Sequence, residues 1–382
     1  VKELTRLYVR YHKESEENPA MDDEARSYFK LIENGDEECV KLFNLFKEIT
    51  LKEVRKIYDE LDIKFDSYAG ESFYNDKMQP VIDELKEKGL LVESEGAQIV
   101  DLEKYGMPPC IILRSDGASL YATRDLAAAC YRKAHYDFDK CLYVVAYQQN
   151  LHFRQIFKVL ELMGKPWAKD LIHVSYGMVS LLDENGNQVA MSTRNGTVVL
   201  LEDVLKKCHE KCLEIIESKN PDLEDKENIA RQVGTGAVVF GALSNSKIKD
   251  IAFSYSKILN FDGETGPYVQ YTAARIKSVL RKAGDKIGAY EIKDINDDEY
   301  SLVSLLSTFP DVVKAAADKL EPFFITRYAI DVASAFNKFY FDHKIIGEDE
   351  NTTNMRLAIC SATLTVITSA LTLLGIKVPE RM

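Results

Sequence analysis

Residues 141–176, CLYVVAYQQNLHFRQIFKVLELMGKPWAKDLIHVSY, combine two kinds of periodicity. The apolar runs at 142–146 and 172–176 have the length of buried strands, and between them the apolar positions of residues 152–163 recur at helical spacing. A strand, a helix and a second strand in this order are typical of a parallel βαβ unit. We therefore predict an α/β region with a parallel sheet in the middle of the chain.

Upstream of this unit the sequence predicts helices followed by short strands. The apolar positions before Asp62 recur every three or four residues, which predicts two or three helices there. From Leu90 the period shortens, and the turn signal Asp116-Gly117 favours strands joined by hairpins. The predicted strands cover residues 90–92, 97–102, 110–113 and 120–121, and a helix is predicted over 124–132.

Downstream of the unit the pattern is helical. Residues 200–218 and 226–245 predict two helices, and no strand is predicted beyond them. An apolar stripe on residues 324–339 and a helix over 357–374 that stops at Gly375 indicate a helical domain. The predicted fold class is therefore α/β plus all-α.

The composition is that of a globular protein in a reducing compartment. The 382 residues include 46% hydrophobic and 29% charged side chains, which excludes wholesale disorder and fibrous repeats. Seven cysteines, an odd number, favour a cytoplasmic protein without a disulfide framework. A net charge of −12 argues against nonspecific coating of nucleic acid. The weakly polar run 362–376 is too short to span a membrane, so we predict a buried core helix and no membrane association.

Polar clusters stand at two strand-to-helix junctions. Thr123 and Asp125 open the helix predicted after the hairpins, and helix capping alone would explain both residues. A second cluster at 148–153 follows the strand 142–146 directly, and the carboxyl ends of parallel strands form the crevice where open α/β sheets bind ligands. A loop of amides without a ligand explains this second cluster equally well.

Two further segments carry weaker signals of a ligand. Residues 190–197, AMSTRNGT, form a small polar loop with one cation, which suits either phosphate binding or an ordinary surface loop. Cys208, His209 and Cys212 are close in sequence, but no second ligand pair stands at zinc spacing. We therefore predict helix residues there and no metal site.

Residues 262–275 place aromatic rings beside an arginine. Pro267 suits the first turn of a helix, in which Tyr268, Tyr271 and Arg275 share one face. Such a set suits stacking on unpaired bases, although a tyrosine stripe more commonly faces a protein core.

In their order along the chain these clusters resemble the motifs of arginyl-tRNA synthetase, a class I enzyme. The residues that carry the resemblance are Tyr121-Ala122-Thr123-Arg124-Asp125, Gln149-x-Leu151-His152-Phe153, Met191-Ser192-Thr193-Arg194 and Asp262-Gly263-Glu264-Thr265-Gly266-Pro267-Tyr268-Val269-Gln270-Tyr271. The resemblance extends over essentially the whole chain, including Val378-Pro379-Glu380-Arg381-Met382 at its end. Each motif alone is weak, but four in the family's order form a strong signal.

The resemblance implies ATP-dependent activation of L-arginine and its transfer to arginine tRNA. ATP, with Mg²⁺, would be a substrate, and no tightly bound cofactor is expected. A guanidinium has five donors and no acceptor, so carboxylate, phenol and amide oxygens suit it. The implied residues are Tyr121, Asp125 and Gln149 for arginine binding, His173, Gly177, Met178 and Met191 for ATP binding, and Ser192, Thr193 and Arg194 for catalysis at the ATP phosphates.

By the same resemblance the chain carries the second half of a Rossmann-like parallel sheet and a helical anticodon-binding bundle. The expected regions are a mostly helical connecting or insertion region at 1–90, the half of the catalytic domain at 91–200, a helical linker or stem-contact region at 201–248, and the anticodon-binding domain at 249–382. The residues expected at the anticodon are Tyr271, Arg275, Phe336, Tyr340 and Met382. The full-length protein is expected to be monomeric.

The sequence departs from the family where ATP would bind. The six histidines do not form the His-x-Gly-His element with which class I enzymes hold ATP, and Val1 already lies in a helical pattern. Ala146, Ala190 and Thr197 also differ from the family's usual Gly, Lys and Asn. We therefore expect the C-terminal two-thirds of a longer enzyme, inactive alone, whose incomplete sheet promotes self-association.

Two other classes of protein remain open at this point. One is a non-catalytic module that binds tRNA through the helical bundle alone. The other is a regulatory protein that binds a nucleotide on the sheet without the ligase chemistry.

Overall fold

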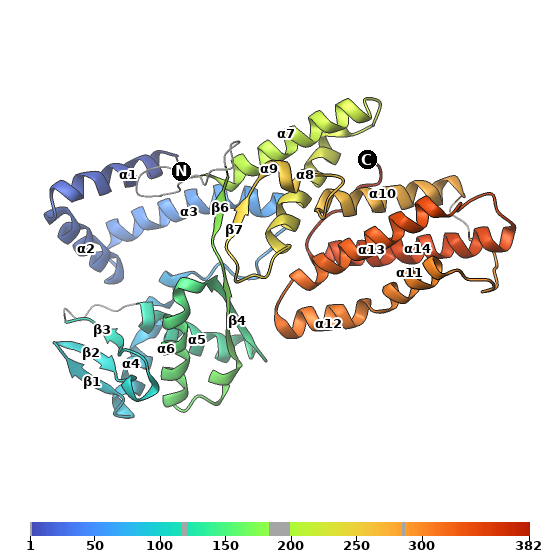
Figure 1. Cartoon of the computed structure of the whole chain (residues 1–382). Coiled ribbons are helices and arrows are strands. Elements are labelled where there is room, and N and C mark those ends of the chain that lie inside the picture. Colours follow the sequence, from blue (N-terminus) through green and yellow to red (C-terminus); the bar gives the residue numbers. More distant parts are fainter. Residues whose placement is uncertain (1, 116–120, 183–198, 285–286) are drawn as a thin grey trace. The chain divides into compact units, whose positions relative to one another are not determined.

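The computed structural model describes residues 2–115, 121–182, 199–284 and 287–382. Contacts divide the chain into two compact units, one formed by Val1–Arg55 and Lys64–Gly177 and the other by Lys56–Ile63 and Met178–Met382. Figure 1 shows the order of the helices and strands along the chain. The region boundaries at residues 90, 200 and 248 remain predictions.

The first unit begins with three helices, which confirms the prediction for the residues before Asp62. The helices are α1 (Lys2–Glu17), α2 (Ala20–Glu33) and α3 (Glu37–Glu60), followed by the 3-10 helix η1 (Glu71–Lys77) and by α4 (Met78–Glu87). α2 and α3 bury none of their side chains, and Phe29 and Phe46 are exposed. α4 instead buries Val81, Ile82 and Leu85 in the apolar core of this unit.

A small antiparallel sheet follows, in the order β1-β2-β3. Its elements are β1 (Leu91–Ser94), β2 (Ala97–Val100), the 3-10 helix η2 (Glu103–Tyr105) and β3 (Cys110–Leu113), with α5 (Tyr121–Tyr136) after them. The predicted strand at 120–121 is wrong, because Tyr121 opens α5, whereas Leu120 lies outside the described residues. Thr123 does not cap the helix, because it lies inside α5 and its hydroxyl donates to the carbonyl of Ile112.

The predicted βαβ unit is confirmed. Its elements are β4 (Cys141–Ala146), the 3-10 helix η3 (Tyr147–Gln149), α6 (Asn150–Leu162), the 3-10 helix η4 (Pro166–Asp170) and β5 (Leu171–Tyr176). β4 and β5 are parallel, and their register pairs Ala146 with Tyr176 at the carboxyl ends. α6 buries Phe153, Ile156 and Leu160 against the core, which explains the helical spacing of its apolar residues.

The second unit contains a pair of packed helices and two short strands. These elements are β6 (Val179–Leu181), α7 (Leu201–Lys219), α8 (Lys226–Leu243), β7 (Ile251–Phe253) and α9 (Tyr255–Ile258). α7 and α8 share a core to which the last turn of α3 adds Ile57. β6 and β7 pair in parallel, so the prediction of an entirely helical chain beyond residue 245 is wrong. Three residues are too few to show a strand period in the sequence.

Five longer helices complete this unit. They are α10 (Gly266–Lys282), α11 (Asp297–Ser307), α12 (Phe309–Lys319), α13 (Phe323–Asp342) and α14 (Glu350–Leu373). α10 starts as predicted, with Pro267 in its first turn and the Thr265 hydroxyl accepting the Tyr268 N–H at 3.3 Å. The predicted stripe on α13 is buried, with Val332 and Phe336 both fully inaccessible.

α14 extends further than the apolar run in the sequence indicated. It begins at Glu350 and has a mean hydropathy of 1.5 over a window long enough to cross a membrane. In the bundle it packs against α10 and α13, and its Cys360, Ile367 and Leu371 lie in the core. Core packing therefore accounts for these apolar side chains, the role predicted for residues 362–376.

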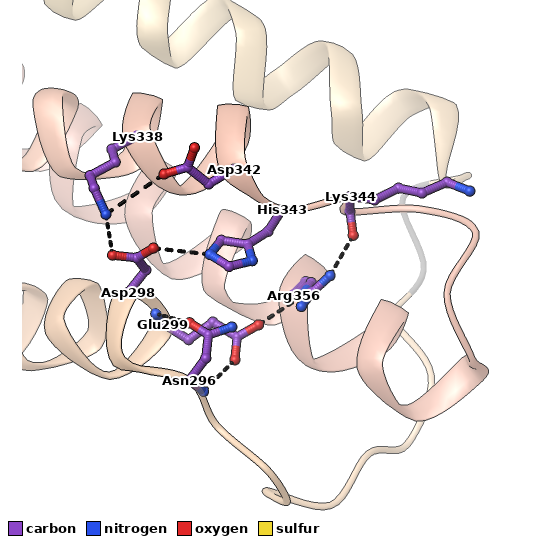
Figure 2. A network of polar contacts seen from close by, with 8 residues as sticks. All are labelled: Asn296, Asp298, Glu299, Lys338, Asp342, His343, Lys344 and Arg356. Carbon is purple, nitrogen blue, oxygen red and sulfur yellow. Dashed lines mark hydrogen bonds and ion pairs between the residues drawn. The ribbon is translucent and has the colours of Figure 1, made fainter.

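Polar contacts hold α11, α13 and α14 together at one end of the bundle, and Figure 2 shows them. Arg356 donates from Nε to Glu299 Oε1 at 2.7 Å, and the side chains of this ion pair are only 12% and 1% exposed. Asp298 accepts from Lys338 and, at 3.1 Å, from His343 Nε2. These two partners lower the pKa of Asp298, Lys338 having the larger effect.

Candidate functional site

The residues expected to bind arginine lie on α5 and on the 3-10 helix η3 that follows β4. Tyr121 begins α5 and is 66% exposed, whereas Asp125 lies one turn further along the same helix and is partly buried. Gln149 is exposed at the end of η3, where the chain leaves β4. His152 on α6 reaches Asp125, with Nε2 2.6 Å from the carboxylate Oδ2. His152 therefore orients one oxygen of Asp125, a role that the sequence analysis did not assign although His152 belongs to a quoted motif.

A second residue that sequence reasoning did not assign, Arg124, anchors the helix on which Asp125 lies. Arg124 is only 6% exposed and forms an ion pair with Glu33 at the end of α2. Its Nε donates to Asn75 at 3.2 Å, and its guanidinium lies 5.4 Å from the centre of the Phe29 ring. A buried arginine needs such partners, so α5 is tied to η1 and α2 at this point.

The residues expected to bind ATP fall into different parts of the structure. His173 on β5 is partly buried, with Nε2 2.9 Å from the carbonyl of Val145, and Gly177 is buried just after the strand. Met178 belongs to the second unit, where its side chain is 49% exposed and its N–H donates to Asp250 at 2.7 Å. The remaining candidates, Met191, Ser192, Thr193 and Arg194, lie outside the described residues.

Four of the five residues expected at the anticodon line one pocket of the second unit. The pocket has a volume of about 620 Å³. α10 provides Tyr271 and Arg275, α13 provides Tyr340, and the segment after α14 provides Met382. The other lining residues are Asn220, Asp222, Leu223, Glu224, Ala274, Ser278, Val279, Arg281, Lys282 and Arg381. Residues far apart in the sequence therefore converge on a single cavity.

Arg275 lies between two aromatic rings in this pocket. Its guanidinium carbon is 4.9 Å from the ring centre of Tyr271 and 5.3 Å from that of Tyr340. One guanidinium nitrogen donates to Asn337 at 2.5 Å, and the Asn337 amide in turn donates to Thr272 at 2.9 Å. Both tyrosines are exposed, at 39% and 38% of their residue surface. The two tyrosines can therefore each receive a flat group, while Arg275 lies close to both rings.

Phe336 does not line the pocket. Its side chain is fully buried in the core of the helical bundle, and its ring stacks on Tyr340 with 6.1 Å between the ring centres. A ligand in the pocket therefore meets Tyr340, while Phe336 supports that ring from the core side. Sequence periodicity places both residues on α13 but does not distinguish the buried ring from the exposed one.

The pocket combines stacking surfaces with positive charge. Arg275, Arg281, Lys282 and Arg381 outnumber the acidic residues Asp222 and Glu224 in the lining. Cationic groups attract a phosphate backbone, and exposed aromatic rings stack on bases that are splayed out of a loop. The chemistry of the pocket therefore suits single-stranded nucleic acid.

The Cys-His-Cys group of α7 has a structural role. Cys208 and Cys212 lie in the core, and burial raises the pKa of both thiols to about 12. His209 Nε2 lies 3.3 Å from Glu60 and 3.0 Å from the Thr235 hydroxyl. Burial lowers the pKa of His209 and raises that of Glu60. Within the described ranges no three His, Cys, Asp or Glu side chains are grouped as metal ligands.

Two protein-family models match the chain, one over its first part and one over the helical bundle. The model for the catalytic domain of class I tRNA synthetases (R) matches residues 1–255. The model for the DALR anticodon binding domain matches residues 269–382. Together with the parallel βαβ unit and the helical bundle, these matches define a class I aminoacyl-tRNA synthetase.

The chain belongs to the arginyl-tRNA synthetase (arginine–tRNA ligase) family. It is 52% identical to the arginine–tRNA ligase of Clostridium beijerinckii and 53% identical to that of Clostridium botulinum strain Loch Maree, over 100% of this chain and 67% of each relative. The arginyl-tRNA synthetase structure from Thermus thermophilus matches 99% of this chain and 69% of its own, with a TM-score of 0.85 at 26% identity. The structure from Plasmodium falciparum matches with a TM-score of 0.79 at 27% identity, over 94% of this chain and 62% of its own.

Proposed function

We propose that the helical bundle of this chain recognises the anticodon loop of arginine tRNA through the pocket that contains Tyr271, Arg275, Tyr340 and Met382. The convergence of these residues from α10, α13 and the segment after α14 carries the proposal. A splayed base would stack on Tyr271 or Tyr340, and Arg275 would donate to a base edge or a phosphate. Phe336 would act indirectly by fixing the Tyr340 ring.

In the complete reaction we propose that the first unit binds L-arginine. Asp125 would accept from the substrate guanidinium, with Tyr121 and Gln149 supplying further oxygens. A planar guanidinium forms its strongest contacts with a carboxylate, which supports Asp125 as the central residue. The hydrogen bond from His152 leaves the second carboxylate oxygen of Asp125 for the substrate.

ATP, as its Mg²⁺ complex, would be the second substrate. We propose His173, Gly177, Met178 and Met191 at the nucleotide and Ser192, Thr193 and Arg194 at its phosphates. Attack of the arginine carboxylate on the α-phosphate forms the adenylate and releases pyrophosphate, and positioned donors stabilise the charge that develops there. A hydroxyl at the tRNA 3′ end then attacks the arginyl carbonyl of the adenylate, which forms the ester and releases AMP. We propose that the enzyme acts in the cytoplasm.

We further propose that these 382 residues do not aminoacylate by themselves. The supporting observation is that no His-x-Gly-His element is present among them. An assay with radiolabelled arginine, ATP, Mg²⁺ and arginine tRNA should give no charged tRNA above background. Charging above background would contradict this proposal.

Fluorescence anisotropy tests the proposed anticodon pocket directly. Labelled arginine tRNA and the same tRNA with an altered anticodon are titrated with this chain at one fixed salt concentration, because salt governs such affinities. We expect a clear preference for the arginine anticodon. Equal, weak binding of both tRNAs would contradict the proposal. A non-catalytic tRNA-binding module would show the same preference, so the aminoacylation assay of a longer chain containing these residues separates the two functions.

A further inference from the structure

The segment 377–382 is fastened to α10 through its backbone carbonyl groups. The Gln270 amide donates to the carbonyl of Lys377 at 2.7 Å. Lys277 Nζ lies 3.4 Å from the carbonyls of residues 378 and 379, and the Arg281 guanidinium donates to that of Glu380 at 3.1 Å. Three side chains of one helix therefore hold successive points of an irregular segment.

The Glu380 side chain contacts two of the α10 side chains that hold the segment. Its carboxylate accepts from Lys277 Nζ at 2.6 Å and lies 3.9 Å from the Arg281 guanidinium. The Lys277 side chain is 15% exposed and Glu380 is 79% exposed. Glu380 thus reaches back from the surface to two cations that already contact its own backbone segment.

One face of α10 holds the segment and the neighbouring face lines the pocket, and Arg281 belongs to both because it contacts Glu380 and also lines the pocket. Gln270, Lys277 and Arg281 are separated by seven and four residues, which places them on one face of the helix. The pocket residues of α10, Tyr271, Arg275, Ser278 and Lys282, follow the same spacing displaced by one residue. Since one residue corresponds to about 100° of rotation, the segment held on the first face lies beside the pocket on the second. The last two residues of the segment, Arg381 and Met382, line that pocket.

We propose that Glu380 is a positioning residue for anticodon recognition. Its ion pairs with Lys277 and Arg281 fix the segment 377–382 so that Arg381 and Met382 form one wall of the pocket. This inference rests on the proposed function of the pocket. Neither Glu380 nor Lys277 lines the pocket, so both act through the segment 377–382 and, for Glu380, through the lining residue Arg281 with which it pairs.

Removing the charge of Glu380 distinguishes a positioning role from a general electrostatic effect on RNA binding. Replacing it with glutamine removes one negative charge beside four lining cations, so nonspecific attraction for RNA should stay the same or increase. If Glu380 positions the wall, the preference for the arginine anticodon should nevertheless fall. A solvent-exposed ion pair has a modest effect, so we expect the ratio of the two affinities to fall about fivefold.

The experiment compares the whole chain with Glu380→Gln, Lys277→Met and the conservative variant Lys277→Arg, which keeps a cation and its donors at residue 277. Fluorescein-labelled arginine tRNA and its altered-anticodon form are the probes, at one salt concentration. Glu348→Gln is the matched control, because it makes the same charge change at an exposed residue that does not line the pocket. Hydrogen–deuterium exchange of residues 377–382 reports on the segment without any tRNA.

The expected result is a lower affinity ratio and faster exchange of the segment in Glu380→Gln and Lys277→Met, with both properties close to the wild type in Lys277→Arg. The control should match the wild type. An unchanged ratio and unchanged exchange in Glu380→Gln would overturn the inference. A wild type that binds both tRNAs equally overturns the proposed function instead, and the exchange data then decide alone whether Glu380 fixes the segment.

Discussion

Replacing Arg275 with lysine keeps the positive charge of the anticodon pocket but removes the planar guanidinium. In the structure that plane contacts the Tyr271 and Tyr340 rings at 4.9 and 5.3 Å and donates to Asn337. A lysine ammonium is a compact point charge, so from one position it cannot contact both rings and also donate to Asn337. The substitution therefore tests geometry at constant charge.

The size of the effect follows from these contacts. Each cation–π contact at a partly exposed site contributes about 0.5–1 kcal/mol, so losing both lowers the stability of the pocket by about 1–2 kcal/mol. If Arg275 also contacts a base, the affinity for arginine tRNA falls by about 1–3 kcal/mol, which is roughly 5- to 150-fold. The altered-anticodon tRNA should lose much less, because it does not use the specific contact.

The assay is the anisotropy titration repeated at several salt concentrations. Arg275→Lys should leave the slope of log K against log salt unchanged, because no charge is lost. Lys282→Gln is the comparison, since loss of a phosphate contact lowers the slope by roughly 0.7 and weakens both tRNAs alike. Binding by Arg275→Lys within about twofold of the wild type for both tRNAs would refute the assigned role of the guanidinium plane.

Two further predictions concern stability. Arg356→Met leaves the Glu299 carboxylate buried without its cationic partner, so the free energy of unfolding in urea should fall by about 3–5 kcal/mol. Adding Glu299→Gln to this variant should recover much of the loss. A loss below about 1 kcal/mol would contradict the stabilising role of the buried ion pair. Burial, and secondarily Arg231, lowers the pKa of His209 below its ordinary value of 6.5. Below that pH the unfolded chain takes up a proton that the folded chain does not, so stability is retained above pH 6.5 and falls as the pH decreases. His209→Gln should flatten this dependence in thermal unfolding from pH about 7.5 to about 5.5, and an unchanged slope would show that other groups cause it.

The sequence was sufficient to predict those helices and strands that are long enough for their hydrophobic period to repeat several times. The alternation in residues 141–176 predicted β4, α6 and β5, because each element contains several turns or residue pairs of one pattern. β7 was not predicted, because its three residues pair with a strand more than seventy positions earlier and the local sequence pattern does not show such a contact. Thr123 was misread because a hydroxyl near a helix start suits a cap, whereas its partner is the carbonyl of Ile112 on a neighbouring strand.

The pocket residues also show that local sequence pattern does not predict contacts made by tertiary packing. Tyr271 and Arg275 stand four residues apart, so helical spacing alone predicts that they are neighbours. Tyr340 and Met382 join them only through tertiary packing, and their inclusion depended on the resemblance to a family. Asn337, which orients Arg275, carried no signal in the sequence, because an asparagine on a helix face is usually solvated.

α10 has no side chain that is free to vary. Of its seventeen residues, all of which the structure describes, only Tyr271 and Lys282 are exposed, and both line the pocket. The other positions lie in the core, hold the segment 377–382 or line the pocket from partly buried positions. A saturation scan of substitutions should therefore find no tolerant face on this helix. On α10, a change in which tRNA is read would fall on lining residues such as Tyr271, Arg275, Ser278 or Lys282, whose neighbouring positions leave little room for compensation.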